Sequence, residues 1–375
     1  MRVLRIDDRS LYQQLVGVGG LGTGIFFALE GNHTLGRNES RPGELLNIRD
    51  YCKLHIVIHY VAKLLGGQCF RVLPVGKVGN DEAGRFVLKE MNEAGIDTRY
   101  VEALDDKPTL FSVCFQYPDG AGGNITTNNS AAAELSEHDL AKTEDVLTAA
   151  PRTIALSLPE VSLEVRDHLL KLATHAQSFR AASFVSAEIA AAKQLGMFER
   201  LDLVALNEAE GAELIGPDFS ADDLRGCMDK CVDFLHRTYR HLHMVISCGK
   251  NGAYALNHET WNYCPAPRVE IASTAGAGDC LLGGILAAMA AGIPFLSARP
   301  PRQSLAERPL ETALEFGVLL ASYKVTSPHT IHPDASLSSL ITFAERARLQ
   351  FCPALLRLFT ESPVGEAGPS RSPGL

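Results

Sequence analysis

The sequence predicts an α/β protein in which a mostly parallel, doubly wound sheet lies between two layers of helices. The first observation is that short apolar runs alternate with amphipathic segments along most of the chain. The second is that runs such as 204–206 and 244–246 are apolar throughout, which is typical of parallel strands buried on both faces. The third is that two polar, turn-rich segments interrupt this alternation and predict a small antiparallel β lid.

The expected elements of the main body follow each other as strand and helix. A strand over 69–76 precedes a helix over 81–93, whose apolar residues recur at near-helical spacing. The later expected strands are 153–158, 201–206 and 243–247, and the later expected helices are 163–173, 209–215 and 281–291.

The lid is expected from the segments 27–48 and 109–127. The first is rich in Gly, Asn and Pro, and the second alternates apolar and polar residues before a turn. We expect both to pair as antiparallel strands over the carboxyl edge of the main sheet. Phe111, Val113 and Phe115 fall on one face of such a strand. That apolar face predicts a homodimer formed through the lid.

The length of 375 residues is consistent with one large domain over 1–350. Residues 351–375 are then expected to be a C-terminal extension. Its end, from Pro363 onward, is rich in Gly, Ser and Pro and is expected to be disordered.

Composition excludes several classes of protein. Hydrophobic residues make up 46% of the chain, which excludes a mostly disordered protein, and a net charge of −9 argues against nucleic acid as a partner. No apolar run approaches the roughly 18 residues of a membrane span. Acidic residues stand near the N-terminus where a signal peptide is apolar, and the nine cysteines are scattered. We therefore expect reduced thiols in a cytoplasmic protein.

A loop of small residues leads directly into the apolar helix near the C-terminal third of the chain. Gly276, Ala277 and Gly278 allow the backbone to approach a ligand, and the free amides of a helix start favour a phosphate. Asp279 follows at once and could accept the proton of a substrate hydroxyl held there. The alternative is that Asp279 is an ordinary N-cap.

Two further motifs follow expected strands. Asn207 and Glu210 either form a capping box or present an amide and a carboxylate to Mg²⁺ at a strand end. Ser247, Gly249 and Gly252 either form an ordinary hairpin turn or border a bound ligand. The residues alone leave both alternatives open.

Together these motifs resemble the PfkB/ribokinase family of carbohydrate kinases. Residues 273–279 match the family signature D-T-x-G-A-G-D at all but the first position, and 75–84 resembles its V-G-x-D-x-x-G segment. The N-x-x-E and T-x-G-x-x-G motifs of the family occur in the same order as Asn207/Glu210 and 247–252. The resemblance implies a ribokinase-like fold and ATP-dependent phosphorylation of a hydroxyl on a sugar or a sugar-containing small molecule.

The resemblance also implies roles for individual residues. Asp279 would be the general base and 276–278 the anion hole. Asn207 and Glu210 would organise Mg²⁺, in part through water. The residues that would border ATP are Ser247, Gly249, Gly252, Gly317 and Val318.

The chain departs from the family at the sugar site. The Gly-Gly pair and Asn that bind the sugar are absent from 50–66. The polar residues that could replace them are Asn38, Asp50, Lys53, His55 and His59, although each is also compatible with an ordinary surface or helix position. Ser273 stands where the family often has an Asp that helps to hold a monovalent cation, which puts activation by potassium in doubt.

Two other functions compete with this interpretation. The run Gly17-x-Gly19-x-x-Gly22 fits a dinucleotide fingerprint and would indicate an NAD-dependent oxidoreductase, if a helix followed it. The altered sugar site is also compatible with a non-catalytic nucleotide- or sugar-binding relative of the family.

Overall fold

The computed structural model describes residues 2–7, 10–66, 70–119, 122–149 and 153–361. Its centre is a nine-stranded sheet with the order β14-β13-β12-β11-β10-β9-β2-β5-β6. All neighbours from β12 to β6 pair in parallel, and β13 and β14 add an antiparallel edge. The strands are β2 (Gln14–Val18), β5 (Arg71–Gly79), β6 (Tyr100–Leu104), β9 (Thr153–Ser157), β10 (Phe179–Ser183), β11 (Leu203–Asn207), β12 (His243–Ser247), β13 (Ala253–Leu256) and β14 (Trp261–Cys264).

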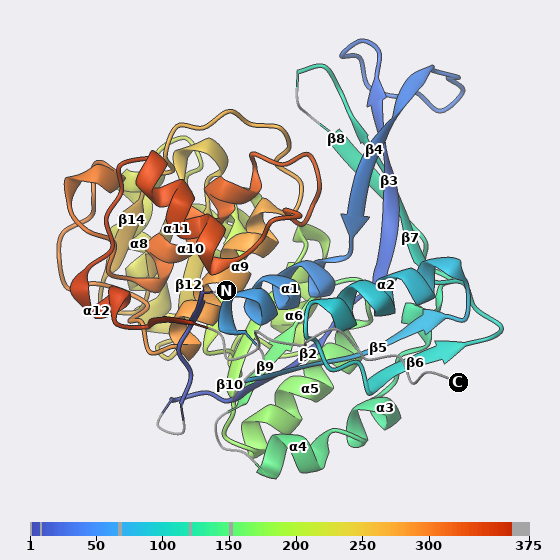
Figure 1. Ribbon diagram of the computed structural model, residues 1–375, viewed down its shortest axis with the longest axis horizontal. Helices are drawn as coiled ribbons and strands as arrows, with labels where there is room; N and C mark the ends of the chain where they lie inside the picture. Colours follow the sequence, from blue (N-terminus) through green and yellow to red (C-terminus); the bar gives the residue numbers. More distant parts are fainter. Residues whose placement is uncertain (1, 8–9, 67–69, 120–121, 150–152, 362–375) are drawn as a thin grey trace, which may run out of the picture.

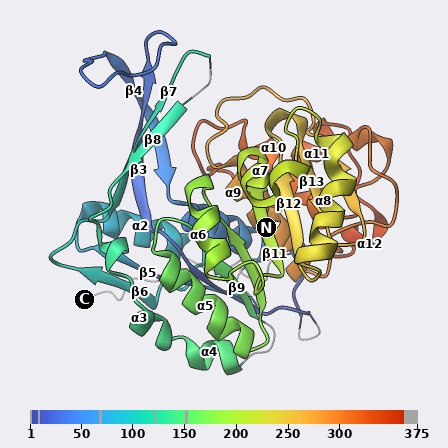
Figure 2. The same cartoon turned by 180° about the vertical axis from the view of Figure 1, so that it is seen from behind.

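Helices cover both faces of this sheet, as Figures 1 and 2 show from opposite sides. One face carries α1 (Lys53–Leu65), α2 (Glu82–Glu93), α9 (Ala277–Ala290), α10 (Ala313–Lys324) and α11 (Leu337–Arg346). The other carries α3 (Glu137–Ala141), α4 (Glu144–Ala149), α5 (Leu163–His175), α6 (Ile189–Gln194), α7 (Glu208–Ile215) and α8 (Leu224–Thr238). The predicted three-layer α/β/α fold class is therefore confirmed. No described helix has the length and hydropathy needed to cross a bilayer.

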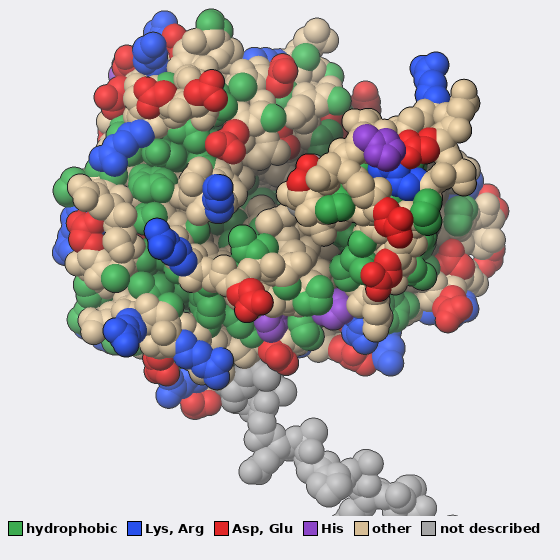
Figure 3. Space-filling view, turned by 90° about the horizontal axis from the view of Figure 1, so that it is seen from above, with side chains coloured by type: hydrophobic (Ala, Val, Ile, Leu, Met, Phe, Trp, Pro, Cys, Tyr) green, Lys and Arg blue, Asp and Glu red, His purple; other side chains and the backbone are tan. Residues whose placement is uncertain are grey.

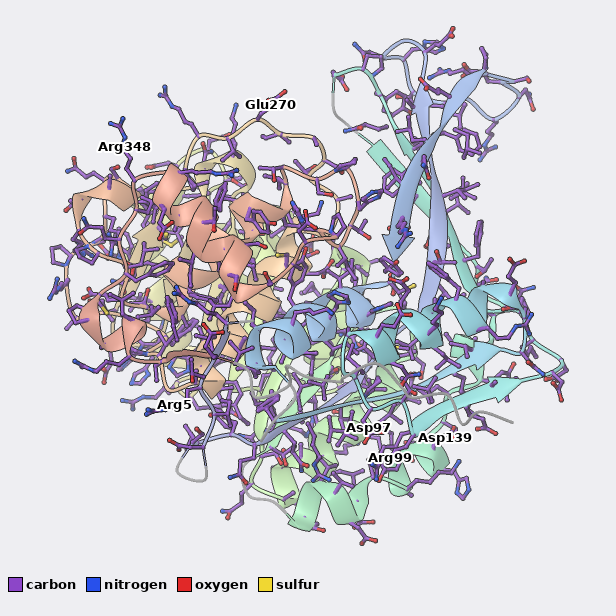
Figure 4. The ribbon with its side chains drawn as sticks, viewed as in Figure 1. Arg5, Asp97, Arg99, Asp139, Glu270 and Arg348 are labelled. Atoms are coloured by element: carbon purple, nitrogen blue, oxygen red, sulfur yellow. The ribbon has the colours of Figure 1, made fainter. Side chains whose placement is uncertain are left out.

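The core explains why these segments are strands. Every residue of β2 and β9 is buried, because helices cover both faces of the parallel sheet. On one face α9 and α10 pack closely, since a side chain on Gly284 would lie 3.0 Å from the Cα of Gly317. On the other face Lys77 of β5 forms an ion pair with Asp139 of α3 (3.1 Å). Asp139 is labelled in Figure 4.

The lid is a four-stranded sheet that projects from the carboxyl edge of the main sheet (Figure 1). Its order is β4-β3-β7-β8, and its strands are β3 (Gly22–Leu29), β4 (Gly43–Tyr51), β7 (Leu110–Gln116) and β8 (Gly122–Thr126). The two hairpins are antiparallel as expected, but β3 and β7 pair in parallel, so the expectation of antiparallel pairing between the two segments is wrong. Both strands leave the main sheet at its carboxyl edge and run in the same direction.

The register gives the lid two chemically different faces. Ile25, Val113 and Ile125 lie opposite one another on adjacent strands and share the outer face. Phe26, Cys114 and Asn124 share the other face and line a cavity against the body. Alternation therefore places apolar residues away from the body and a mixed, polar set toward it.

The end of the chain returns to its beginning. After α12 (Pro353–Leu356), β15 (Phe359–Glu361) pairs antiparallel with β1 (Arg2–Leu4). The segment expected as a C-terminal extension thus contributes a strand to a two-stranded sheet. The expected disordered tail from Pro363 onward lies outside the described residues.

Candidate active site

Three adjoining cavities lie along the carboxyl edge of the main sheet. We call them the outer cavity (about 810 Å³), the middle cavity (about 250 Å³) and the lid cavity (about 710 Å³). The middle cavity shares Gly278 with the outer cavity and Asp279 with the lid cavity. Viewed from above, the surface is hollowed between the lid and the C-terminal half (Figure 3). The loop that carries Glu270 rises along the same edge (Figure 4).

The small-residue loop forms the junction between these cavities. Gly276 is the N-cap of α9 with φ 73°, and a side chain there would lie 2.8 Å from the carbonyl oxygen of Thr330. The N–H of Ala277 donates to Thr274 (3.1 Å), so helix geometry leaves the N–H groups of Gly278 and Asp279 for a ligand. These two groups and the positive end of the helix dipole favour an anion at this position.

Asp279 is the third residue of α9 and does not cap it, because Gly276 occupies the N-cap position. The alternative interpretation as an ordinary N-cap is therefore wrong. Its Oδ1 lies 3.8 Å from Nζ of Lys53, the first residue of α1. The carboxylate of Asp279 is the main cause that raises the pKa of Lys53. Lys53, selected from the sequence as a candidate, therefore lies at this junction.

Glu160 is a residue of this site that the sequence reasoning missed. It follows β9 with φ 77°, an unusual conformation for a side chain other than glycine, and it lines the lid cavity. Its Oε2 accepts a hydrogen bond from the backbone N–H of Lys53 (3.3 Å). Burial raises the pKa of Glu160 to about 7. An acidic residue just beyond a buried parallel strand was the signal that could have identified it.

The remaining residues that the sequence suggested for the sugar site fall into two groups, those that line the lid cavity and those that do not. Asp50 is 7% exposed, lines the lid cavity and accepts a hydrogen bond from Sγ of Cys114 (3.5 Å). Burial raises the pKa of Asp50 to about 6. His55 lies instead in the core, with its ring centroid 4.5 Å from that of Tyr51, and neither of its ring nitrogens has a hydrogen-bond partner among the described residues. Burial lowers the pKa of His55.

Asn38 and His59 are also away from the cavity. Asn38 is exposed in the loop between β3 and β4, at the far end of the lid. His59 is buried one turn beyond His55 on α1 and lines neither the lid cavity nor the middle cavity. Of the sequence candidates for the acceptor, the structure thus brings only Asp50 and Lys53 to the site.

Asn207 and Glu210 form a complete capping box at the edge of the middle cavity. The backbone N–H of Asn207 donates to Oε2 of Glu210 (2.8 Å), and that of Glu210 donates to Oδ1 of Asn207 (2.9 Å). Nδ2 of Asn207 also donates to Oε1 of Glu210 (2.9 Å). Burial raises the pKa of Glu210. The capping role is thus realised, and both side chains also line the cavity.

The two side chains fit Mg²⁺ bound through water. In the described part of the chain, no three His, Cys, Asp or Glu side chains gather into a metal site. Mg²⁺ in phosphate-transfer sites keeps several waters and uses one or two carboxylates together with the phosphates. A single carboxylate beside an amide, in the same cavity as the small-residue loop 276–278, matches that requirement.

The turn after β12 borders the outer cavity. Ser247, Gly249 and Gly252 all line it, and Val318 of α10 belongs to the same lining. Gly252 has φ 98°, and a side chain there would lie 2.0 Å from the carbonyl oxygen of Cys264, so the hairpin requires glycine. Gly317 does not line this cavity, because it packs against Leu281 and Ile285 of α9.

The glycine run expected for a dinucleotide fold has a different structure. Gly17 and Gly19 lie at the end of β2 and just beyond it, and Gly22 begins β3. The helix that a dinucleotide site requires is thus replaced by a lid strand. This removes the structural basis for an NAD-dependent oxidoreductase.

Comparison with known proteins agrees with the geometry. The model of the pfkB family of carbohydrate kinases matches residues 57–336. A ribokinase of Dictyostelium discoideum is 23% identical over 59% of this chain and 71% of its own length. Fructokinase-1 of Oryza sativa subsp. japonica is 26% identical over 72% of this chain and 81% of its own length.

Solved structures show the same fold. A crystal structure of ribokinase from Cryptococcus neoformans var. grubii in complex with ADP superposes with a TM-score of 0.69 at 20% identity, over 88% of this chain and 99% of that one. Ribokinase of Arabidopsis thaliana, complexed with ribose and ATP, gives a TM-score of 0.62 at 18% identity, over 88% and 98% of the two chains. The predicted ribokinase-like fold is confirmed. The chain therefore belongs to the pfkB family of carbohydrate kinases, phosphotransferases whose acceptor is an alcohol group.

Proposed function

We propose that this protein transfers the γ-phosphate of ATP to a hydroxyl of a neutral sugar or sugar-containing small molecule bound under the lid. The observation that carries the proposal is the position of Asp279. Its carboxylate lies where the middle cavity opens into the lid cavity, beside the free amides of α9. A hydroxyl in the lid cavity and a phosphate on the amides would therefore meet at Asp279.

The outer cavity supports ATP binding. Its lining joins the turn at 249–252 with apolar residues of α10 and α9, which suits a base and ribose. The triphosphate would extend through the middle cavity toward 276–278. Mg²⁺ bound there would neutralise phosphate charge, with Glu210 and Asn207 holding its water shell.

Asp279 and Lys53 have different roles in the proposed reaction. Asp279 takes the proton of the attacking hydroxyl, and the amides of Gly278 and Asp279 stabilise the charge on the transferring phosphoryl group. Lys53 places a positive charge beside the Asp279 carboxylate and the reacting atoms. The lid excludes water, which would otherwise compete as the acceptor.

The charge of the lid cavity favours a neutral acceptor. Among the described residues that line it, the acids are Asp50, Glu160, Glu188 and Asp279, whereas Lys53 is the single cation. Hydroxyl and amide groups of the lid, including Ser112, Asn124 and Thr126, complete the lining. Hydroxyl groups of a sugar can donate to these carboxylates, whereas a sugar acid or sugar phosphate would be repelled.

The outer face of the lid supports a homodimer. Leu45 is 59% exposed and Ile125 is 69% exposed, and both belong to the apolar face turned away from the lid cavity. A second copy that presents the same face would cover these residues by two-fold symmetry. The pairing would also steady the strands that line the lid cavity.

Phosphate transfer from ATP to a panel of neutral sugars, nucleosides and sugar acids tests the proposal. Transfer to neutral acceptors supports it. Thermal stabilisation by ATP without transfer to any acceptor would instead indicate the alternative, a non-catalytic nucleotide- or sugar-binding relative.

A further inference from the structure

Lys324 is a fully buried lysine beside residues 272–278, the loop that leads into α9 and that we call the anion loop. It is the last residue of α10, and its Nζ donates to the carbonyl oxygen of Ser273 (3.2 Å) and to that of Ala275. Lysine is almost never fully buried unless its charge is paired. Here the hydrogen-bond partners are two neutral carbonyl groups of one loop.

The residue that follows α10 makes further hydrogen bonds to this loop. The carbonyl oxygen of Val325 accepts hydrogen bonds from the N–H groups of Ala272 (2.8 Å) and Ser273 (3.3 Å). Oγ of Ser273 accepts from the N–H of Ala275 (3.2 Å). The loop therefore reaches Gly276, the N-cap of α9, with its preceding residues tied to the end of α10.

The two carbonyl groups favour a positive charge at the point on which their oxygens converge. Backbone carbonyl oxygens that converge on one point can replace the hydration shell of a monovalent cation. Ser273, the residue nearest this point in the signature, contributes no charge. The ammonium of Lys324 occupies the point and supplies the charge covalently.

The neighbouring charges favour the ammonium form. Burial lowers the pKa of Lys324 to about 8, while the carboxylates of Asp279 and Asp50 act in the opposite direction. The ammonium form therefore predominates at neutral pH. Its hydrogen bonds fix the direction of the loop carbonyls, and so the position of the amides that follow.

We propose that Lys324 is a built-in cation that positions the anion loop, so that turnover requires no dissolved monovalent cation. Lys324 is a positioning residue because it touches the loop and does not reach the reacting atoms. The inference rests on the proposed kinase activity of the same site.

The wild-type protein and the variants Lys324→Ala and Lys324→Met test this inference when each is assayed in KCl, NH₄Cl and choline chloride at equal ionic strength. The wild-type protein should have the same kcat in all three salts. Lys324→Ala should lose about 10²-fold in kcat in choline chloride, because a displaced loop misplaces the amides. K⁺ or NH₄⁺ should restore most of that loss by entering the vacated space. Lys324→Met should lose activity without restoration, because its side chain fills the space.

Lys193→Ala is the matched control. Nζ of Lys193 donates to the carbonyl oxygen of Glu213 (2.9 Å) on the surface, so its removal deletes a similar contact away from the site. Its kcat should remain unchanged in every salt. Thermal unfolding in each salt verifies that the variants are folded, and if Lys324→Ala does not fold, the wild-type comparison decides alone.

A wild-type kcat that falls several-fold in choline chloride would overturn the inference. Full activity of Lys324→Ala in choline chloride, or a folded Lys324→Ala protein that neither cation restores, would also overturn it. A wild-type protein that transfers phosphate to no acceptor in any salt would instead overturn the proposed function.

Discussion

Nζ of Lys53 lies 3.8 Å from Oδ1 of Asp279. Lys53 begins α1 and Asp279 lies in the first turn of α9, and these two helices pack side by side. The ion pair sits where the middle cavity meets the lid cavity. It links α1 with α9, the helix that begins at the small-residue loop 276–278. The predictions below depend on this junction and on the carboxylates around it.

Asp279→Asn should lower kcat by about 10²–10⁴-fold, because an amide keeps the shape of the side chain but cannot accept the acceptor's proton. ATP binding, measured by thermal shift, should persist. Asp334→Asn, on a loop outside the three cavities, is the control and should leave kcat unchanged. Near wild-type turnover in Asp279→Asn would remove Asp279 from the role of base.

Glu210→Gln should raise the Mg²⁺ concentration needed for half-maximal rate, because it removes the single negative charge that this motif offers to the ion. The amide would also face Nδ2 of Asn207, so one hydrogen bond worth about 1 kcal/mol is lost. Glu213→Gln removes an exposed carboxylate from the same helix and is the control. An unchanged Mg²⁺ titration would leave Glu210 with the capping role alone.

Asp50→Asn should raise the KM for the acceptor at least tenfold and leave the KM for ATP unchanged. In the proposed site the Asp50 carboxylate would accept hydrogen bonds from acceptor hydroxyls, and charge-assisted bonds of this kind are the stronger ones. Asn38→Ala changes a polar residue of the same lid far from the cavity and should have no effect. Equal changes in both KM values would argue that Asp50 supports the fold and does not contact the acceptor.

The contribution of Glu160 and Asp50 to the free energy of unfolding of the ligand-free protein should decrease as the pH rises from about 4.5 to 7. Burial raises the pKa of Glu160 to about 7 and that of Asp50 to about 6, so the folded state binds more protons than the unfolded state in this range. Their stabilising contribution is complete below the unfolded pKa values and is lost as the pH passes the folded ones.

Glu160→Gln should therefore remove part of this slope, and the melting temperature measured from pH 4.5 to 8 checks it. The difference in melting temperature between variant and wild type should shift in favour of the variant as the pH rises. Glu164→Gln, exposed on α5, should follow the wild-type curve. Parallel curves for Glu160→Gln and wild type would show that Glu160 titrates normally.

Ile125→Lys should convert a lid-mediated dimer into a monomer, because it places a charge on the exposed apolar face of the lid. Light scattering after size-exclusion chromatography measures the mass. Leu356→Lys, at an exposed apolar residue of α12, is the control and should remain dimeric. A wild-type protein that is monomeric at all concentrations would refute the lid interface.

The body of the fold could be predicted from sequence because its signals are local. The expected strand over 243–247 has the same bounds in the structure, and the helix expected over 81–93 begins one residue later because Asp81 is its N-cap. The strand β3 could not be recognised from the sequence, because the glycines at its start resemble those of a turn that precedes a helix. The parallel partner β7 that holds it as a strand lies far away in the sequence.

The candidate site could be predicted from the sequence only where its residues are contiguous. The motif around Asp279 is contiguous, so its residues necessarily arrive together. The lid cavity, proposed to hold the acceptor, is lined by residues of β4, α1 and the segment after β9, and polarity alone could not distinguish Asp50 from His55. Which side of α1 faces the core was decided by packing against α9.

The parallel pairing of β3 with β7 also bears on the order in which the chain folds. Each lid hairpin joins strands that are neighbours in sequence, so each can close early. The contact between the hairpins must wait until α1, β5, α2 and β6 have brought residue 110 back to residue 22. The lid cavity is lined from Phe26 to Thr330, whereas the outer cavity is lined from Asn207 to Val325, so the lid cavity depends on contacts of greater sequence separation. We therefore expect a refolding molecule to gain affinity for ATP before it gains affinity for the acceptor.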